Sequence, residues 1–151
     1  MDALTEEGAL QEADLIGMSL DVGSASLGLL FDLRTALQLR TGNAAVIIAR
    51  GLTRFEWANC YKTEPGAFHS FSVISSKPEA LDGLLHLMID LVPDAGLTIS
   101  APEAEFFVGD VPDITEVSPN LLGDSLEEIR RQMPSWSAEF RPLYATFLDP
   151  M

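Results

Sequence analysis

Hydrophobic and polar residues alternate along much of this chain, with the period of two that is typical of half-buried β-strands. In residues 27–39, Phe31 and Leu33 fall on one face and Asp32 falls on the other. The leucine, alanine and glutamine residues of this segment also favour a helix, but a helical period scatters its charges around the whole circumference. We therefore predict one strand over 27–39 and a shorter strand before it over 15–22.

Residues 44–49 are apolar at every position and rich in β-branched side chains, which is typical of a central strand that is buried on both faces. Gly51 predicts a bulge or a sharp bend, and Pro93 and Gly96 predict a turn. Residues 75–83 are predicted to be a connection. Alternation or short apolar runs predict further strands over 52–57, 68–74, 84–91, 97–100, 104–108 and 143–148.

One helix is predicted late in the chain. Ser125 and Glu128 have the spacing of a capping box, an apolar stripe follows at helical period, and Pro134 ends the pattern, which places the helix over 125–132. Roughly eight short strands with one late helix predict a mainly β fold, either an antiparallel β-sandwich or an open barrel. The alternative is an α+β layer with the helix over one sheet.

The length of 151 residues is that of one domain. Residues 1–14 carry five acidic side chains and few large apolar ones, so we predict a flexible acidic tail that contributes little to stability, followed by a single β-rich domain over 15–151. The N-terminus lacks the basic and apolar regions of a secretory signal, and no apolar run is long enough to span a bilayer. With one cysteine, Cys60, the sequence predicts a cytoplasmic protein.

The formal charge is −14, from 9 basic and 23 acidic residues. A surface this acidic repels phosphate backbones and anionic membranes, which disfavours nucleic-acid and membrane binding and leaves basic proteins as partners. Residues 101–128 contain eight acids and no base, whereas residues 34–77 contain six bases and two acids. Two other interpretations are that the acidic flanks neutralise the basic centre, or that the charge only maintains solubility. The residues that we assign to a partner-binding surface are Glu103, Glu105, Asp110, Asp113 and Glu116.

Motifs of known catalytic chemistry are absent from the sequence, and we assign no catalytic residue, metal ligand or cofactor. Residues 23–28 are glycine-rich but lack the lysine of a phosphate loop, so we interpret them as a turn. His69 and His86 are interpreted as surface or core-edge residues, and Cys60 as an incidental thiol, because each lacks a partner at a diagnostic spacing. The acidic loop over 109–116 does not match a calcium-binding pattern and is interpreted as a solvated loop.

The segments 105–112 and 134–137, with the region around 32–34, resemble those of small acidic bacterial proteins of uncharacterised function, over roughly residues 18–148. In general character such chains are similar to the immunity proteins of contact-dependent toxin systems, which are small, acidic and cytoplasmic. Such proteins often lack an active site; the resemblance brings no known catalytic residue and transfers no site residues.

The sequence therefore predicts a non-enzymatic, cytoplasmic protein-interaction domain that binds a basic protein, with immunity-like neutralisation of a basic toxin as one version. One alternative is a small metal- or cysteine-dependent enzyme, if His69, His86 and Cys60 share a cleft. Another alternative is a small-ligand carrier, if the fold encloses an apolar pocket. The partner, the oligomeric state and the strand order are not fixed by these patterns.

Overall fold

The computed structural model describes residues 1–60, 70–116 and 125–149. Within those residues it contains nine strands and one short helix, so the prediction of a mainly β fold with one late helix is confirmed. The elements are β1 (Asp14–Asp21), β2 (Ser26–Asp32), β3 (Ala44–Arg50), β4 (Arg54–Asn59), β5 (Phe71–Leu81), β6 (Leu84–Val92), β7 (Ala95–Ala101), β8 (Glu103–Asp110), α1 (Leu126–Arg131) and β9 (Arg141–Leu148).

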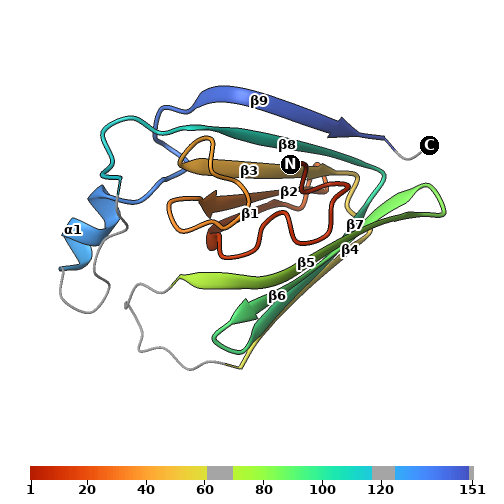
Figure 1. Cartoon of the computed structure of the whole chain (residues 1–151). Coiled ribbons are helices and arrows are strands. Elements are labelled where there is room, and N and C mark those ends of the chain that lie inside the picture. Colours follow the sequence, from red (N-terminus) through yellow and green to blue (C-terminus); the bar gives the residue numbers. More distant parts are fainter. Residues whose placement is uncertain (61–69, 117–124, 150–151) are drawn as a thin grey trace.

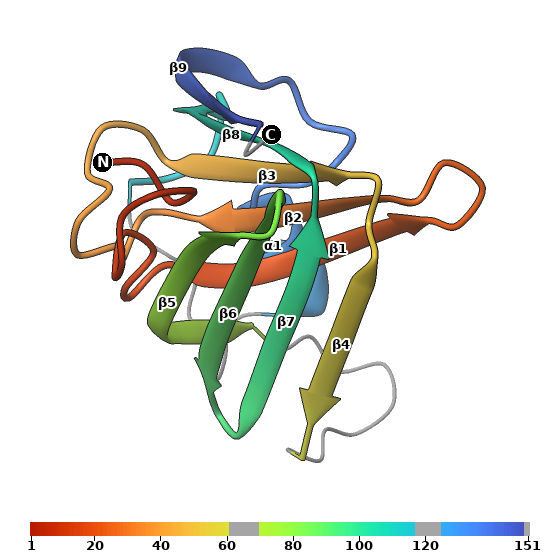
Figure 2. The ribbon, with the colours of Figure 1, turned by 90° about the vertical axis from the view of Figure 1, so that its right-hand side faces the viewer.

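The described strands form one antiparallel sheet in the order β4-β7-β6-β5-β1-β2-β3-β8-β9, and the sheet is not closed into a barrel. Its two halves meet at a narrow joint, because β1 and β5 pair only through Asp14 with Ser72 and Leu15 with Phe71. The sheet folds back across this joint, so that the two halves face each other (Figure 1) and their strands run in different directions (Figure 2). This arrangement resembles two sheets packed face to face at a steep angle.

The hydrophobic core lies between the two halves. In β6, Leu85, Leu87, Ile89 and Leu91 are all at most 2 % exposed, and Met88 between them is 54 % exposed. This alternation confirms the inward and outward faces that the sequence predicted over 84–91. The opposite half contributes the inward side chains of β2, β3 and β8, listed here by name: Leu27, Leu29, Phe31, Ala45, Ile47, Ala49, Ala104, Phe106 and Val108.

The N-terminal segment before β1 packs into the space between the two halves, which corrects the expectation of a tail that contributes little. Leu4 and Leu10 are 2 % and 0 % exposed, and both belong to the core cluster. The backbone of this segment bonds to β5, since Gly8 N donates to Ser76 O at 2.9 Å and Glu12 N donates to Val73 O at 2.9 Å. The acidic side chains that dominate its composition alternate with apolar groups that fill the core.

Two predicted boundaries are wrong. The strand expected over 27–39 ends at Asp32, because Leu33 N donates to Asn43 O at 2.9 Å and the chain turns there. The connection expected over 75–83 is instead the second part of β5, which continues to Leu81. Asp82 and Gly83 then form a two-residue hairpin turn with φ of 56° and 74°, a conformation that an Asp-Gly pair favours.

The start of the predicted helix is confirmed. Ser125 precedes α1 as its N-cap, and its side-chain oxygen accepts a hydrogen bond from Glu128 N at 3.2 Å. This bond satisfies one of the backbone donors that a helix leaves unpaired at its first turn. Ile129 on α1 and Met133 after it are 4 % and 7 % exposed, so these two apolar side chains of the predicted stripe are buried.

Candidate functional site

Apolar side chains also cover the outer face of β2, β3 and β8, which is the face turned away from the core. In the register of the sheet, Leu30 lies opposite Val46, and Val46 lies opposite Phe107. Ile48 follows Val46 on the same face of β3. Because these strands are apolar on both faces, one set of side chains fills the core and the other set forms a second apolar surface outside it.

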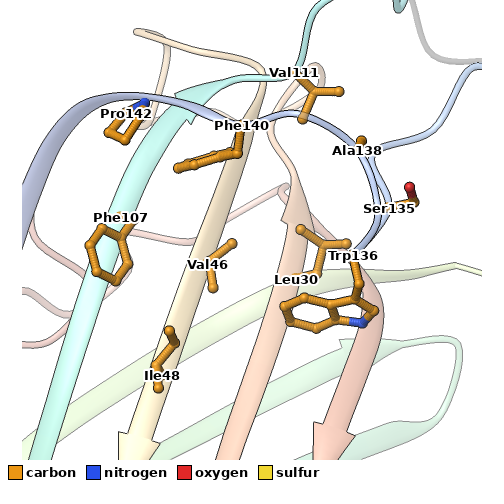
Figure 3. A pocket seen from close by; sticks show the side chains of 10 residues that line it. All are labelled: Leu30, Val46, Ile48, Phe107, Val111, Ser135, Trp136, Ala138, Phe140 and Pro142. Atoms are coloured by element: carbon orange, nitrogen blue, oxygen red, sulfur yellow. The ribbon is translucent and has the colours of Figure 1, made fainter.

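The segment between α1 and β9 lies over this second surface and converts it into a groove of about 270 Å³, shown in Figure 3. We call this feature the outer groove. The side chain of Trp136 stands against one end of it and is 48 % exposed. The residues that line the outer groove are all apolar except Ser135: Leu30, Val46, Ile48, Phe107, Val111, Ser135, Trp136, Ala138, Phe140 and Pro142.

Two glycines make room for the indole of Trp136. A Cβ atom at Gly28 would lie 2.9 Å from Cη2 of the indole, and a Cβ atom at Gly17 would lie 3.0 Å from its Nε1. Both distances are shorter than a normal carbon contact, so a side chain at either position displaces the indole or is excluded by it. Because Gly17 on β1 and Gly28 on β2 have no side chain, the indole of Trp136 can occupy this position.

Strand β9 carries the apolar surface to the edge of the sheet. Leu143 and Phe147 on its outer side are 49 % and 63 % exposed. On the inner side, the Tyr144 hydroxyl donates to Met1 O at 2.9 Å, and the ring of Tyr144 stacks edge-on against Phe106. Exposed aromatic and aliphatic side chains thus lie next to the outer groove. Monomeric proteins rarely leave large apolar areas of this kind uncovered.

A buried ion pair fixes the loop between β2 and β3. Arg34 and Asp32 have side chains that are 2 % and 0 % exposed, and Nη2 of Arg34 lies 2.7 Å from Oδ2 of Asp32. Nη1 of Arg34 also donates to Thr115 O at 3.2 Å. Burial, together with the negative charges of Asp32 and Glu12, raises the pKa of the nearby Asp14 to about 6.

This ion pair borders a polar cleft of about 500 Å³ on the loops at that end of the sheet. Asn43 joins the two sides of the loop region, because Nδ2 donates to Val111 O at 3.0 Å and Oδ1 accepts from Val111 N at 2.8 Å. Arg34 spans the same two loops through Asp32 and Thr115. These contacts of Asn43 and Arg34 hold the loops together, and we interpret the cleft as structural.

The five acids predicted for partner binding fall into two groups. Glu103 and Glu105 lie at one end of β8, and Asp110, Asp113 and Glu116 lie at or beyond its other end, roughly 20 Å away at the rise of a strand. The structure therefore does not gather them at one place. Their charge is also partly neutralised, since Arg50 of the basic centre forms an ion pair with Glu105 and lies opposite Glu103.

The residues of the predicted enzyme alternative do not gather in the part of the chain that the structure describes. Nδ1 of His86 lies 2.8 Å from Oγ of Ser100, at one end of β6. Cys60 is exposed, and its backbone N–H donates to Asp94 O beyond the other end of β6. His69 lies outside the described residues. Over residues 1–60, 70–116 and 125–149 we find no group of three or more His, Cys, Asp or Glu side chains placed to hold a metal ion.

The outer groove was not predicted from the sequence. Two signals were present: strands β2, β3 and β8 are apolar at consecutive positions, and Gly17 and Gly28 interrupt otherwise bulky strands. In an antiparallel sheet such continuous apolar runs require a cover on both faces, or they leave one apolar face exposed.

In the part of the chain that the structure describes, no helix is long and apolar enough to cross a membrane.

Comparison with known proteins gives little further information. No family model matches the chain, and no curated protein matches it. Among solved structures, the chain is similar to an uncharacterized protein from Neisseria gonorrhoeae, with 14 % identity and a TM-score of 0.46. The similarity covers 67 % of this chain and 94 % of that chain, and it adds nothing on function.

Proposed function

We propose that this chain is a non-enzymatic protein-interaction domain that binds a basic protein through the outer groove and the adjoining side of β9. The observation that carries the proposal is an exposed apolar groove, lined by Trp136, Phe107 and Phe140, in a chain of net charge −14. A chain with that charge is soluble without help, so an uncovered apolar surface of this kind is the feature that needs a function.

The composition of the groove is that of an interface centre. Protein interfaces derive most of their binding energy from a few aromatic side chains that are desolvated in the complex. Trp136 and Phe147 are the exposed aromatics here, at 48 % and 63 %. The neighbouring Phe107 and Phe140 are half-buried and form the wall against which a partner's apolar side chain packs.

One member of each acidic group lies next to a residue of this groove. Glu105 lies opposite Ile48 on β3 and Phe147 on β9, immediately beyond one end of the lining. Asp110 is the last residue of β8, at its other end, next to Val111 of the lining. Charges at the rim of an interface act mainly on the rate of association and on the choice of partner, and they favour a partner of positive charge. Cytoplasmic neutralisation of a basic toxin is one version of this proposal.

The test is a binding measurement with the partner isolated from the native host. We expect Trp136→Ala to increase the dissociation rate by ~10-fold or more, as removal of an anchoring aromatic does. The combined replacement of Asp110, Asp113 and Glu116 by their amides is expected to slow association by several-fold, and the effect disappears at ~1 M salt, where the Debye length is ~3 Å. A chain that keeps both rates in these variants contradicts the proposal.

The matched control removes the same number of charges elsewhere. Glu7, Glu56 and Glu79 are all exposed and lie on the N-terminal segment, β4 and β5, away from the outer groove. Their combined replacement by glutamine is expected to leave both rates unchanged at physiological salt, because none of them lines the groove and salt screens exposed charges over ~8 Å. If the control variant slows association as much as the first variant does, the rate depends on the net charge of the chain and not on the acids beside the groove.

A second candidate function is supported by the same cavity. The outer groove has about 270 Å³ and an almost wholly apolar lining, close to the lower limit of about 300 Å³ for pockets that hold small molecules. An apolar fluorescent probe such as Nile red distinguishes the two functions. Saturable, stoichiometric binding of the probe that Trp136→Ala abolishes, without any effect of that variant on the protein partner, favours a carrier of apolar ligands.

A further inference from the structure

Among the described strands, β9 and β4 are the two edges of the sheet, and they differ in the chemistry of their outer sides. At the edge formed by β4, the outer side carries Arg54 and Glu56, which form an ion pair. Charged side chains of this kind discourage an edge strand from pairing with another chain. β9 begins with Arg141, which is ion-paired with Glu139, and beyond it the outer side of the strand carries Leu143, Ala145 and Phe147, all exposed.

The inner side of β9 has the opposite character. The hydroxyl of Thr146 donates to Oδ1 of Asp2 at 2.7 Å, which places this carboxylate beside the edge. Burial raises the pKa of Tyr144, and the negative charges of Asp2 and Glu6 raise it further, so both carboxylates act on this side of the strand. The free edge of β9 therefore lies between an apolar outer side and an acidic inner side.

We propose that the partner segment is an extended peptide that adds to β9 as a further antiparallel or parallel strand, with apolar and basic side chains in alternation. This rests on the proposed function and specifies its binding mode. Successive side chains of an added strand point to opposite faces of the sheet. One set lies beside Leu143 and Phe147 and is apolar, and the other lies beside Tyr144 and Thr146, facing Asp2 and Glu6, and is basic.

Charge decides between this occupant and a second copy of the chain. Two copies paired through β9 place apolar side chains together on the outer side. The same pairing brings the inner sides together as well, and with them two sets of Asp2 and Glu6, in two chains that each carry a net charge of −14. Like charges facing each other across paired strands are destabilising, whereas a basic strand is attracted.

The test uses capped synthetic peptides of eight residues, the length of β9. One peptide alternates lysine and valine, a second has the same composition in two blocks, and a third alternates glutamate and valine. We expect the first to bind at least ~10-fold more tightly than either of the others, because only it matches both sides of the edge. N-methylation of its backbone at alternate residues along one edge is expected to abolish binding, since strand addition depends on main-chain hydrogen bonds.

Variants of the chain locate the peptide. Phe147→Ser is expected to weaken binding of the first peptide by ~10-fold, and Glu6→Gln by a few-fold, whereas the neighbouring exposed Glu7→Gln leaves it unchanged and serves as the matched control. Amide hydrogen exchange in the presence of the peptide is expected to slow in β9 and not in β4. Slowing confined to β4, or equal binding of the alternating and block peptides, overturns the proposal.

Two further outcomes are separable. If the partner protein loses affinity with Trp136→Ala but none of the peptides binds β9, strand addition is refuted and the proposed function stands. If the alternating peptide binds β9 and the partner ignores the groove variants, the outer groove is not the binding surface. Sedimentation equilibrium of the chain alone tests the remaining occupant. If the chain forms a dimer that Phe147→Ser dissociates, the strand that pairs with β9 is a second copy of the chain, and the proposal of a basic peptide is overturned.

Discussion

The packing of the N-terminal segment leads to the most direct prediction, which concerns Leu10. Its side chain is 0 % exposed and belongs to the core cluster, and its backbone N–H donates to Oγ of the buried Ser76 at 3.4 Å. Leu10→Ala keeps the backbone contacts and removes only the apolar side-chain atoms beyond Cβ. The variant therefore measures whether the segment contributes to the core.

The expected loss follows from burial. Replacing a fully buried leucine by alanine costs about 2–5 kcal/mol, with the larger values where the surroundings do not collapse into the cavity. Leu10 lies between the two halves of the sheet, which are held by their own strand pairing and collapse little, so we expect ~3 kcal/mol or more. For a chain of this size, each kcal/mol lowers the melting temperature by roughly 2–4 °C, which gives a shift of roughly 6–12 °C.

The assay is urea unfolding followed by circular dichroism, with thermal unfolding as a second measurement. Glu7→Ala is the matched control, because Glu7 is an exposed residue of the same segment and its replacement is expected to change the free energy of unfolding by less than ~0.5 kcal/mol. Equal values for Leu10→Ala and Glu7→Ala refute the packing of the segment. In that case residues 1–14 behave as the flexible acidic tail that their composition predicts.

Three further predictions concern the polar loops and one strand. The pKa of Asp14 is raised from 3.8 to about 6, mainly by burial, so between these pH values the folded chain keeps a proton that the unfolded chain has released. The free energy of unfolding therefore falls as pH rises from about 4 to about 6, and urea titrations should show a steeper fall for the natural chain than for Asp14→Asn. Arg34→Met leaves Asp32 buried without its partner and should cost ~3–5 kcal/mol in urea unfolding, most of which Asp32→Asn in the same chain restores. Gly42→Ala places a Cβ atom 2.6 Å from a backbone carbonyl oxygen at φ +129° and should cost ~2 kcal/mol or more, whereas Gly96→Ala meets its nearest atom at 3.7 Å and should change the melting temperature little.

The core was predictable wherever one face of a strand is polar. In β6 the alternation alone identifies Leu85 and Leu87 as inward, because the residues between them are polar or exposed. The helix start was predictable for a similar reason, since Ser125 and Glu128 make a contact within one turn. Both features depend only on residues that are close in sequence, and local physical rules are sufficient for them.

The outer groove was not predictable because its formation depends on distant segments. The sequence shows that Val46 and Ile48 are apolar, but it does not show that residues of the segment after α1 lie over them. The position of Trp136 follows from the space at Gly28 on β2, which the sequence neighbours of Trp136 do not reveal. Pairing across about a hundred residues is set by the register of the whole sheet, which no local pattern contains.

The N-terminal segment illustrates a different limit. Composition averages over both sides of a segment, and the acidic residues of 1–14 outweigh Leu4 and Leu10 in that average. Those two side chains fill the space between the halves of the sheet because the joint at β1 and β5 is narrow and the fold is not closed. The sequence of the segment shows that Leu4 and Leu10 are apolar, but the space that they fill is defined by the rest of the fold.

The net charge and the edge of β9 are physically linked. An exposed edge strand with an apolar side is a hazard, because copies of the same chain can pair along it. Proteins usually protect such edges with charged side chains on the strand itself, as Arg54 and Glu56 do on β4. On β9 the ion pair of Arg141 with Glu139 lies at the start of the strand, and beside Leu143 and Phe147 the charge lies on the inner side and over the molecule as a whole, at −14. That distribution repels a second copy and leaves the apolar side uncovered, so a basic strand is the occupant that gains from both features.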